Sequence, residues 1–361
     1  GGALIDTIAV IDNERIERIS MSNAGTAFLL LEEGKKTEAV DVSTHTGGGA
    51  VNTAVCLARL GHDVAPLIKL GQDQRAETIL NRLADEGIST RFAMRDGRAP
   101  TGASVLVATH DRNAAVFTFR GANTLLEVKD LKPDAFAVDL VYIAGLSNQS
   151  ADCFPHIVEM AKAVGATVAT NPGIRQLTGR TDDFQKSLPK IDILSINRVE
   201  AESLVPSLIK PHGEGGPRLT PKAGRELPPL ASRGLISSAG LSMSLAAFFK
   251  AMLGRGPKWI VITDGRHGAY VASKKTILHC NIMPDVVIAS TVGAGDAFAS
   301  TLSAYLAEGA DPELAILSAT INAAAVVSVL DTQSGLLKRD ALQSRVAKVK
   351  DKLKITGWPM P

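Results

Sequence analysis

Apolar and polar residues follow one another along this chain in short runs that predict strands and helices in turn. β-branched apolar runs bounded by turn residues predict buried strands at 3–10, 64–70, 140–144, 167–170, 191–196 and 259–263. Runs with a helical period predict helices at 51–60, 76–86, 157–164, 241–253, 297–306 and 314–329. Repeated strand–helix–strand order predicts a mainly parallel α/β sheet with helices on both faces.

Two segments interrupt this order, at about 11–45 and 91–123. Both contain polar–apolar alternation separated by turn residues, which is typical of half-exposed strands. We expect them to form a small separate sheet, and such a sheet beside a cleft can act as a lid. An extension of the edge of the main sheet would fit the same pattern. Residues 206–234 are rich in Pro and Gly and predict a surface loop inserted in the domain.

Composition narrows the classes of protein that fit. The chain has 361 residues, a net charge of +2 and 4% aromatic residues, so nothing indicates a nucleic-acid surface. It has no apolar run of about 18 residues and no basic-then-apolar leader, so we expect no membrane segment and a cytoplasmic location. Three widely separated cysteines indicate free thiols in a reducing compartment.

The stretch 290–298 places small residues and one carboxylate at the start of a predicted helix. Gly293, Ala294 and Gly295 leave backbone N–H groups accessible to an anion, and the helix dipole favours negative charge at the same point. Asp296 beside this cradle could accept a proton from an attacking hydroxyl while the cradle stabilises a phosphoryl group. For these residues alone, an ordinary turn with Asp296 as a helix cap is the alternative.

A glycine run at 46–54 opens another predicted helix. It matches neither the P-loop pattern nor the dinucleotide-binding pattern, so a phosphate loop is not expected there. A polyhydroxy ligand fits better, held by Asn52, by backbone groups of the run and by Asp6 in the first predicted strand. For Asp6 alone, a surface turn residue is the alternative.

Three shorter motifs also have two interpretations each. Asn197 and Glu200 follow a predicted strand and suit either a capping box or a site where Glu200 orients water around Mg²⁺. The turn 263–268 suits either phosphate groups or a tight hairpin to a strand at 269–272. Asn123, after the second lid segment, suits either a ligand hydroxyl or a turn.

Taken in order, these motifs resemble the PfkB, or ribokinase-like, family of carbohydrate kinases. The resemblance covers nearly the whole chain and implies a single domain over 1–361 with a doubly wound sheet and a small β lid. It also implies ATP- and Mg²⁺-dependent phosphorylation of an alcohol group on a sugar or nucleoside. A homodimer formed through the lid is a further expectation from the resemblance.

The resemblance assigns a role to each motif. Asp296 matches the catalytic base, and Gly293, Ala294 and Gly295 match the anion hole. The positions that match sugar contacts are Asp6, Gly47, Gly48, Asn52 and Asn123. The positions that match nucleotide contacts are Asn197, Thr263, Gly265, Gly268 and Asn322, the last at the border of the adenine pocket. Glu200 matches a Mg²⁺ position that acts through water.

The chain departs from the family pattern at two places near these motifs. Ser290 stands where relatives commonly have an Asp that helps to hold a monovalent cation, so any such site is weakened. Residues 145–149 lack the sugar-binding Glu of ribokinases, which puts ribose itself in doubt.

Three alternatives to a simple sugar kinase stay open at this stage. A nucleoside kinase would use the same frame. A phosphosugar acceptor would need cations such as Arg91, Arg95, Arg98, Arg112 and Arg120. A non-catalytic sugar sensor is the third, and the presence of both Asp296 and Glu200 argues against it.

Overall fold

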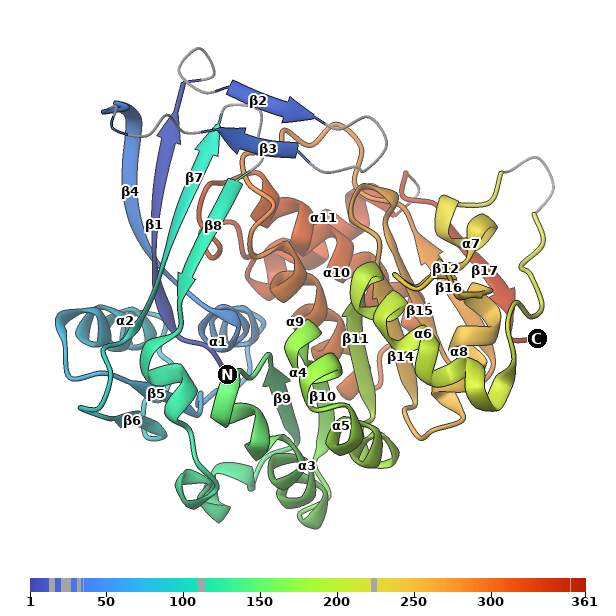
Figure 1. Ribbon diagram of the computed structural model, residues 1–361, viewed down its shortest axis with the longest axis horizontal. Coiled ribbons are helices and arrows are strands. Elements are labelled where there is room, and N and C mark those ends of the chain that lie inside the picture. The colour runs from blue at the N-terminus through green and yellow to red at the C-terminus, as the bar shows by residue number, and fades with distance from the viewer. Residues whose placement is uncertain are drawn as a thin grey trace.

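A seven-stranded sheet forms the centre of the larger part of the protein (Figure 1). The computed structural model describes residues 1–12, 17–20, 27–30, 34, 36–109, 114–221, 226–350 and 352–361. The sheet consists, in chain order, of β9 (Leu140–Ala144), β10 (Thr167–Asn171), β11 (Ile193–Asn197), β14 (Trp259–Thr263), β15 (Ala269–Ala272), β16 (Thr276–Cys280) and β17 (Ile355–Pro359). β9, β10, β11 and β14 are mutually parallel, and the remaining strands continue the sheet in antiparallel order.

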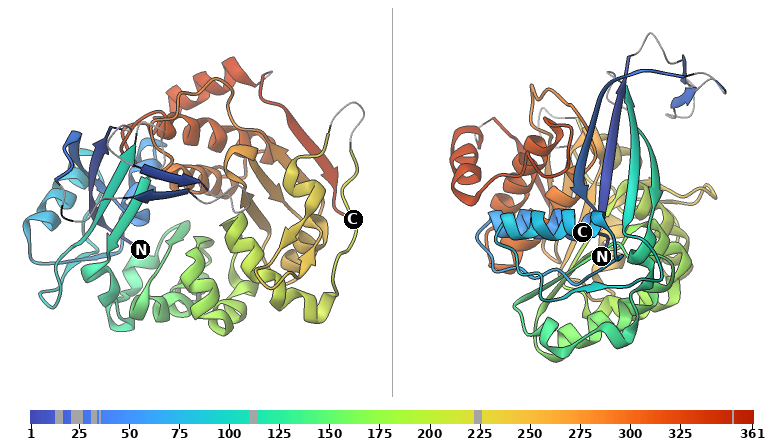
Figure 2. Two further views of the ribbon diagram at one scale, coloured as in Figure 1. Left: turned by 45° about the horizontal axis from the view of Figure 1, so that its top comes forward. Right: turned by 90° about the vertical axis from the view of Figure 1, so that its left-hand side faces the viewer.

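Helices cover both faces of this sheet, as the sequence predicted (Figure 2). Successive side chains of a strand point to opposite faces, so Leu194 and Ile193 of β11 belong to two different hydrophobic cores. The helices that pack with Leu194 are α3 (Phe154–Ala163), α4 (Gly173–Gly179), α5 (Thr181–Ser187), α6 (Arg198–His212), α7 (Pro229–Arg233) and α8 (Leu245–Leu253). The helices that pack with Ile193 are α1 (Gly49–Arg59), α2 (Gln74–Asp85), α9 (Ala294–Ala307), α10 (Pro312–Val327) and α11 (Arg339–Val349).

A separate four-stranded sheet rises from one side of this body (Figure 2). It consists of β1 (Leu4–Ile11), β4 (Ala39–Gly47), β7 (Gly102–Thr109) and β8 (Ala114–Phe119), in the order β4-β1-β7-β8. The sequence placed the first strand at the start of the main strand–helix alternation, and this was wrong. β1 pairs along its whole length with β4 and β7, so it is a central strand of the small sheet.

Two further pairs of short strands lie outside these two sheets. β2 (Glu17–Ser20) and β3 (Ala27–Leu30) pair within the first predicted lid segment. β5 (Ile68–Leu70) and β6 (Ala93–Arg95) form a separate parallel pair, so the strand predicted at 64–70 is shorter than expected.

The two faces of the four-stranded sheet differ in burial. Ile8, Val10 and Leu106 are buried and pack with Val292 and Leu330 of the larger body. Asp6 lies on this same inner face, because residues two apart on a strand share a face. The outer face exposes apolar side chains, which are Val42, Val105, Phe117 and Phe119. The inner face of the sheet thus carries the Asp6 carboxyl group toward the body.

The inserted segment is partly helical, which corrects the prediction of a loop over the whole of 206–234. α6 continues through Pro206 and Pro211 to His212. Its apolar side chains explain this, because Leu204, Val205 and Leu208 are buried in the core and outweigh the hydrogen bond that an internal proline removes. After a loop and the short helix α7, the chain forms the strand pair β12 (Leu235–Ile236) and β13 (Ser242–Met243).

Candidate active site

Asp296 and Asn52 are joined by a hydrogen bond, although they are 244 residues apart in the sequence. Nδ2 of Asn52 in α1 donates to Oδ2 of Asp296 in the first turn of α9, at 2.8 Å. The two helices pack against one another over the carboxyl-end side of β9. The predicted base therefore has a fixed partner from the glycine-run helix, whose Asn52 was expected to contact sugar.

The backbone ahead of Asp296 has the shape of an anion cradle. Gly293 has a φ of 83°, a left-handed conformation that favours glycine, and an added Cβ would lie 2.7 Å from Cβ of Thr332. At Gly295 an added Cβ would meet nothing within 4 Å, so the space above it is open. The first N–H groups of a helix have no partner within the helix. These groups of α9 therefore suit an anionic phosphate.

Asp6 lies at the inner face of the small sheet, next to the glycine run. Its Oδ1 accepts a hydrogen bond from Ser104 of β7. A Cβ at Gly47 would overlap Oδ2 of Asp6, so only glycine allows this approach. Gly48 has a φ of 94°, and its backbone lies against the carbonyl of Gly2, which a Cβ would approach to 2.5 Å. Asp6, Gly47, Gly48 and Asn52 are thus brought together as predicted.

Burial shifts the titration of both carboxyl groups on this side of the site. Desolvation raises the pKa of Asp296, and the hydrogen bond from Asn52 lowers it in part. Desolvation also raises the pKa of Asp6, opposed by the bond from Ser104 and by His45, while the charge of Asp296 adds to the rise. Asp6 therefore lies within the electrostatic field of Asp296.

The predicted nucleotide residues lie at the carboxyl ends of two adjacent strands. Asn197 ends β11 and is paired with Thr263 at the end of β14. Ligands of open α/β sheets bind beyond this edge. Gly265 is exposed at the following turn, and Gly268 is required by packing, because a Cβ there would overlap the carbonyl of Cys280. The turn also leads into β15, so the hairpin expected as an alternative is present.

Asn197 and Glu200 form the capping box that the sequence offered as one interpretation. Oδ1 of Asn197 accepts from the Glu200 N–H at 2.9 Å, and Oε2 of Glu200 accepts from the Asn197 N–H at 2.8 Å. Burial raises the pKa of Glu200, opposed by these bonds. No group of three or more His, Cys, Asp or Glu side chains is close enough to hold a metal within the described ranges. One carboxylate acting through water still fits Mg²⁺ carried by phosphates.

Two predicted contact residues have their side chains occupied by the protein itself. Asn123 bonds to both backbone groups of Ala3, at 2.8 Å each, and donates to the Arg120 carbonyl. Asn322 is fully buried, donates to Thr301 at 2.8 Å and accepts from the Leu337 N–H at 2.9 Å. The geometry gives both amides a structural role, in positioning β1 and in joining α9 to α10.

Tyr142 on β9 is a residue that sequence reasoning missed. Desolvation raises the pKa of its hydroxyl well above the usual value, and the charges of Asp296 and Glu200 both contribute to the rise. Its hydroxyl therefore lies within the electrostatic field of the two predicted functional carboxylates. No sequence signal marked it, because a Tyr inside an apolar strand resembles any other core residue.

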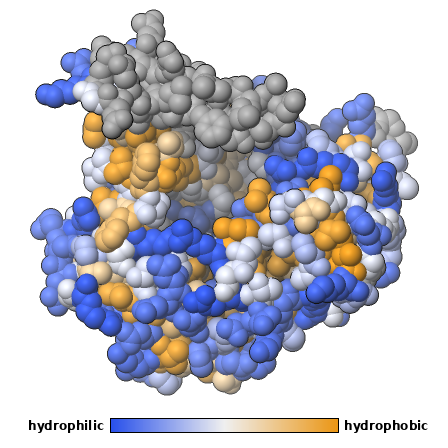
Figure 3. Space-filling view, viewed as in Figure 1, coloured by the Kyte–Doolittle hydropathy of each residue, from blue (hydrophilic) through white to orange (hydrophobic). Residues whose placement is uncertain are grey.

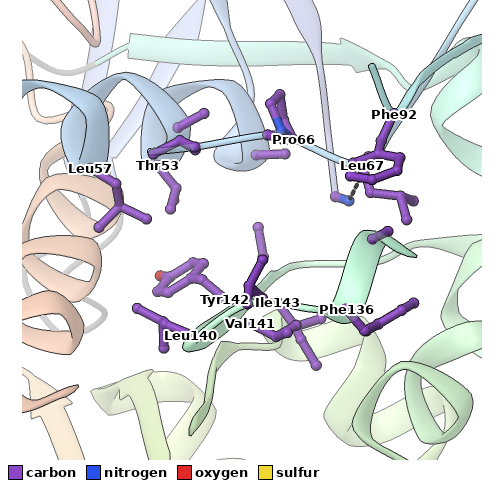
Figure 4. A pocket seen from close by; sticks show the side chains of 18 of the residues that line it. Thr53, Leu57, Pro66, Leu67, Phe92, Phe136, Leu140, Val141, Tyr142 and Ile143 are labelled. Atoms are coloured by element: carbon purple, nitrogen blue, oxygen red, sulfur yellow. Dashed lines mark hydrogen bonds between the residues drawn. The ribbon is translucent and has the colours of Figure 1, made fainter. Parts of the chain in front are cut away.

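A cavity of about 510 Å³ lies behind the site, between α1 and β9 (Figure 4). Leu57, Pro66, Phe136 and Tyr142 are among the mostly apolar side chains that line it. Neither Asp296 nor Glu200 contributes to its lining. The space between the small sheet and the body, visible as a hollow in Figure 3, is a separate region of the surface.

Comparison with known proteins identifies the family that the sequence motifs resemble. The model of the pfkB family of carbohydrate kinases matches residues 8–227 and 235–339. Deoxyribokinase from Salmonella typhi is 25% identical over 333 residues, which are 91% of this chain and 94% of that protein. Ribokinase from Mus musculus is 26% identical over 291 residues, or 79% of each chain. This protein therefore belongs to the PfkB family of carbohydrate kinases, and the resemblance seen in the motifs is confirmed.

Solved structures support the predicted fold. Ribokinase from Arabidopsis thaliana, solved with ribose and ATP, has a TM-score of 0.69 at 18% identity, covering 95% of this chain and 96% of its own. A nucleoside kinase from Methanocaldococcus jannaschii has a TM-score of 0.71 at 20% identity, covering 96% of both chains. The ribokinase-like fold is thus confirmed, and the protein is a phosphotransferase with an alcohol group as acceptor. In the part of the chain that the structure describes, no helix is long and apolar enough to cross a membrane.

Two glycine substitutions test the structure of the anion cradle. Gly293→Ala combines a left-handed backbone with a clash at Thr332, so we expect it to lower the free energy of unfolding by about 1–3 kcal/mol. Gly295→Ala has open space and no unfavourable φ, so we expect a stability close to that of the wild type. Thermal and urea unfolding of both variants measure the difference, and equal stabilities would contradict the assigned backbone geometry.

Proposed function

We propose that this protein transfers the γ-phosphoryl group of MgATP to a hydroxymethyl group of a small sugar. The observation that carries the proposal is the carboxylate of Asp296, fixed by Asn52 at 2.8 Å and placed beside the open N–H groups at Gly295. A base and an anion cradle at one helix start are what in-line phosphoryl transfer requires. The membership in a carbohydrate kinase family supports the same reaction.

In this proposal Asp296 accepts the proton of the acceptor hydroxyl as the oxygen attacks phosphorus. Its raised pKa matches the task, because burial makes the carboxylate a stronger base than an exposed one. The N–H groups at Gly293, Ala294 and Gly295 stabilise negative charge on the transferring group. Bound MgATP would supply the phosphoryl group and a cation that neutralises its oxygens. Asn197, Glu200, Thr263 and Gly265 are the residues that would border it.

The acceptor would lie between the small sheet and the glycine run. Asp6 is 6% exposed and faces Asp296, and its free carboxylate oxygen suits a sugar hydroxyl. Gly47 and Gly48 let the backbone approach the acceptor closely. Closure of the small sheet would exclude water, which otherwise competes with the sugar as acceptor.

The identity of the sugar is inferred from the relatives of this chain and from residues 145–149. The curated relatives include a deoxyribokinase, several ribokinases and a fructokinase, and because most of them act on pentoses, a pentose or deoxypentose is the first candidate. At the position where ribokinases have a sugar-binding Glu, this chain has only Gly, Leu, Ser, Asn and Gln. Ser147 there is occupied in a turn with Ser150. A deoxysugar, which needs one hydroxyl contact fewer, fits this loss, and a nucleoside with the same ribosyl frame is the alternative acceptor.

A phosphosugar acceptor has little support from the lid arginines. Arg95 pairs with Glu77, and Arg98 pairs with Asp96 and Glu127. Arg91 lies over the ring of Phe92. Arg112 falls outside the described residues. Arg120 remains, half-buried, with burial and the charge of Arg175 lowering its pKa. Arg120 with its neighbour Arg175 is a weak basis for binding the phosphate group of a phosphosugar, so we favour an uncharged sugar.

The test of the proposed function is ATP consumption with a panel of pentoses, deoxypentoses, hexoses and nucleosides. We expect one class of acceptor to be phosphorylated, and Asp296→Asn to lower turnover by about 10²–10⁴-fold because it removes the general base. Acceptors that raise the melting temperature without any turnover would instead favour a non-catalytic sugar sensor. Full activity of the purified Asp296→Asn variant would exclude the base assignment.

Removing the buried charge at Asp296 should stabilise the fold at neutral pH. The pKa of Asp296 is near 3.8 in the unfolded chain and is raised in the folded state. The folded protein therefore loses stability as the pH rises from the unfolded pKa to the folded pKa of this group. Asp296→Asn has no such penalty. We expect its melting temperature to exceed that of the wild type at pH 7 and the difference to shrink toward pH 4. A less stable variant at pH 7 would contradict this assignment.

We also propose a homodimer through the outer face of the small sheet. Phe117 and Phe119 are 60% and 52% exposed, and apolar residues gather over this sheet in Figure 3. Val42 and Val105 extend the same face on β4 and β7. A sheet face with so many exposed apolar side chains is typical of an interaction surface.

The dimer is tested by Phe117→Asp, which introduces a charge into the apolar face at its edge strand β8. We expect a dimeric mass for the wild type and a monomeric mass for the variant in light scattering after size exclusion. The exposed apolar residue Val164 of the body provides a matched control, and Val164→Asp should keep the dimer. A monomeric wild type at micromolar concentration would overturn the proposal.

A further inference from the structure

We propose that Gln333 is a positioning residue that holds Asn52 in the single amide orientation able to donate to Asp296. The inference rests on the proposed function of Asp296 and extends it to a residue that no motif marked. Gln333 lies in the loop between α10 and α11, is 2% exposed and is 281 residues from Asn52 in the sequence. Among the described residues it has no hydrogen bond to Asp296 itself, so its effect on that carboxylate would pass through Asn52.

The amide of Asn52 has two orientations, and two donors select one of them. Thr332 Oγ1 donates to Oδ1 of Asn52 at 2.9 Å, and Gln333 Nε2 donates to the same oxygen at 3.1 Å. If the amide were reversed, its NH₂ group would face both donors and its oxygen would face the carboxylate of Asp296. The Thr332 hydroxyl can turn and accept instead, but the reversed orientation loses the hydrogen bonds with Gln333 and Asp296 and creates repulsion at both.

Gln333 can impose this orientation because its own amide makes four hydrogen bonds, two through Nε2 and two through Oε1. Nε2 donates to the Thr46 carbonyl at 3.0 Å as well as to Asn52. Oε1 accepts from Thr46 Oγ1 and from Arg82 Nε, each at 3.1 Å. A buried amide with two donors and two acceptors satisfied has one stable orientation. Thr46 belongs to the glycine run, so Gln333 fixes the start of that run together with Asn52.

The backbone of the loop is held as firmly as the side chain. Asp331 Oδ1 accepts from the N–H groups of Gln333 and Ser334, at 2.8 and 2.7 Å. The guanidinium of Arg59 donates to the carbonyls of Gln333 and Leu336, also at 2.8 and 2.7 Å. Arg59 is in turn held by Glu86, at the end of α2. Three distant segments thus fix the loop that carries Gln333.

This network leaves one oxygen of Asp296 available for the reaction. Oδ2 accepts from Asn52, while Oδ1 faces Gly49, where an added Cβ would lie 3.4 Å away. Oδ1 therefore faces the glycine run that is proposed to hold the acceptor. The donated hydrogen bond also lowers the pKa of Asp296 against the effect of burial, so it favours the ionised form of the base.

The test is Gln333→Leu, compared with Gln176→Leu as a matched control. Gln176 in α4 is also fully buried, and its amide has no hydrogen-bond partner among the described residues. For Gln333→Leu we expect kcat to fall about tenfold, the KM for ATP to stay unchanged, and the acid limb of the pH profile to move to higher pH. Gln176→Leu should leave kcat and the pH profile as in the wild type.

A readout independent of turnover separates this inference from the proposed function. The carboxyl ¹³C resonance of Asp296 reports its pKa, which we expect to be higher in Gln333→Leu than in the wild type. That shift would support the positioning role even if no acceptor in the panel were phosphorylated. An unchanged titration in a folded Gln333→Leu variant would overturn the inference, whatever the enzyme does to sugars.

A double-mutant cycle checks that the effect passes through Asn52. In an Asn52→Ala background, Gln333→Leu should have no further effect on the pKa of Asp296 or on kcat. An equal effect in both backgrounds would overturn the proposed route. If Gln333→Leu does not fold, Thr332→Val removes the other donor to Asn52 with little change in volume. It should shift the Asp296 titration in the same direction, and an unshifted titration would contradict the inference.

Discussion

The hydrogen bond between Asn52 and Asp296 is the contact on which the arrangement of the site depends. It joins α1 to α9, two helices that each begin at a glycine with a positive φ, Gly48 and Gly293. Both glycines are also places of close backbone approach, to Gly2 and to Thr332. The helix starts, the base and the anion cradle are thus held in one geometry. A buried carboxylate would be costly without such a partner, since its charge is removed from water.

The two carboxyl groups of the site, Asp6 and Asp296, are buried at a cost in stability and are held by hydrogen bonds that partly offset this cost. Burial of Asp6 and Asp296 near one another raises both pKa values and disfavours the ionised state. The protein opposes this with hydrogen bonds from Ser104 and Asn52. Carboxylates that are both desolvated and positioned are found where proton transfer is needed. The same cost explains why the charge-free variant at Asp296 should be the more stable protein.

The sequence predicted where helices and strands begin and end, and which residues lie there, more reliably than it predicted the contacts between these helices and strands. It located α9 and Asp296, the glycine run before α1, and the Asn197 and Thr263 motifs, because turn chemistry and strand ends are local signals. It misplaced β1, whose pattern of apolar residues fits either sheet. It also treated Asn123 and Asn322 as ligand contacts, since a polar side chain near a motif does not reveal whether the protein already uses it.

By itself, the sequence determined the fold class and the family, and it marked Asp296 and residues 293–295 for the proposed roles of base and anion cradle. These depend on the order of strands and helices and on glycines at positions where a side chain would clash. Only the tertiary structure decided which side chains bond to Asn52, because the loop that carries Thr332 and Gln333 is about 280 residues away from it in the sequence. It also decided that Tyr142 lines the cavity between α1 and β9, where the charges of Asp296 and Glu200 act on its hydroxyl. Hydrogen bonds between residues hundreds of positions apart leave no periodic or local pattern, so they become visible only once the helices have packed.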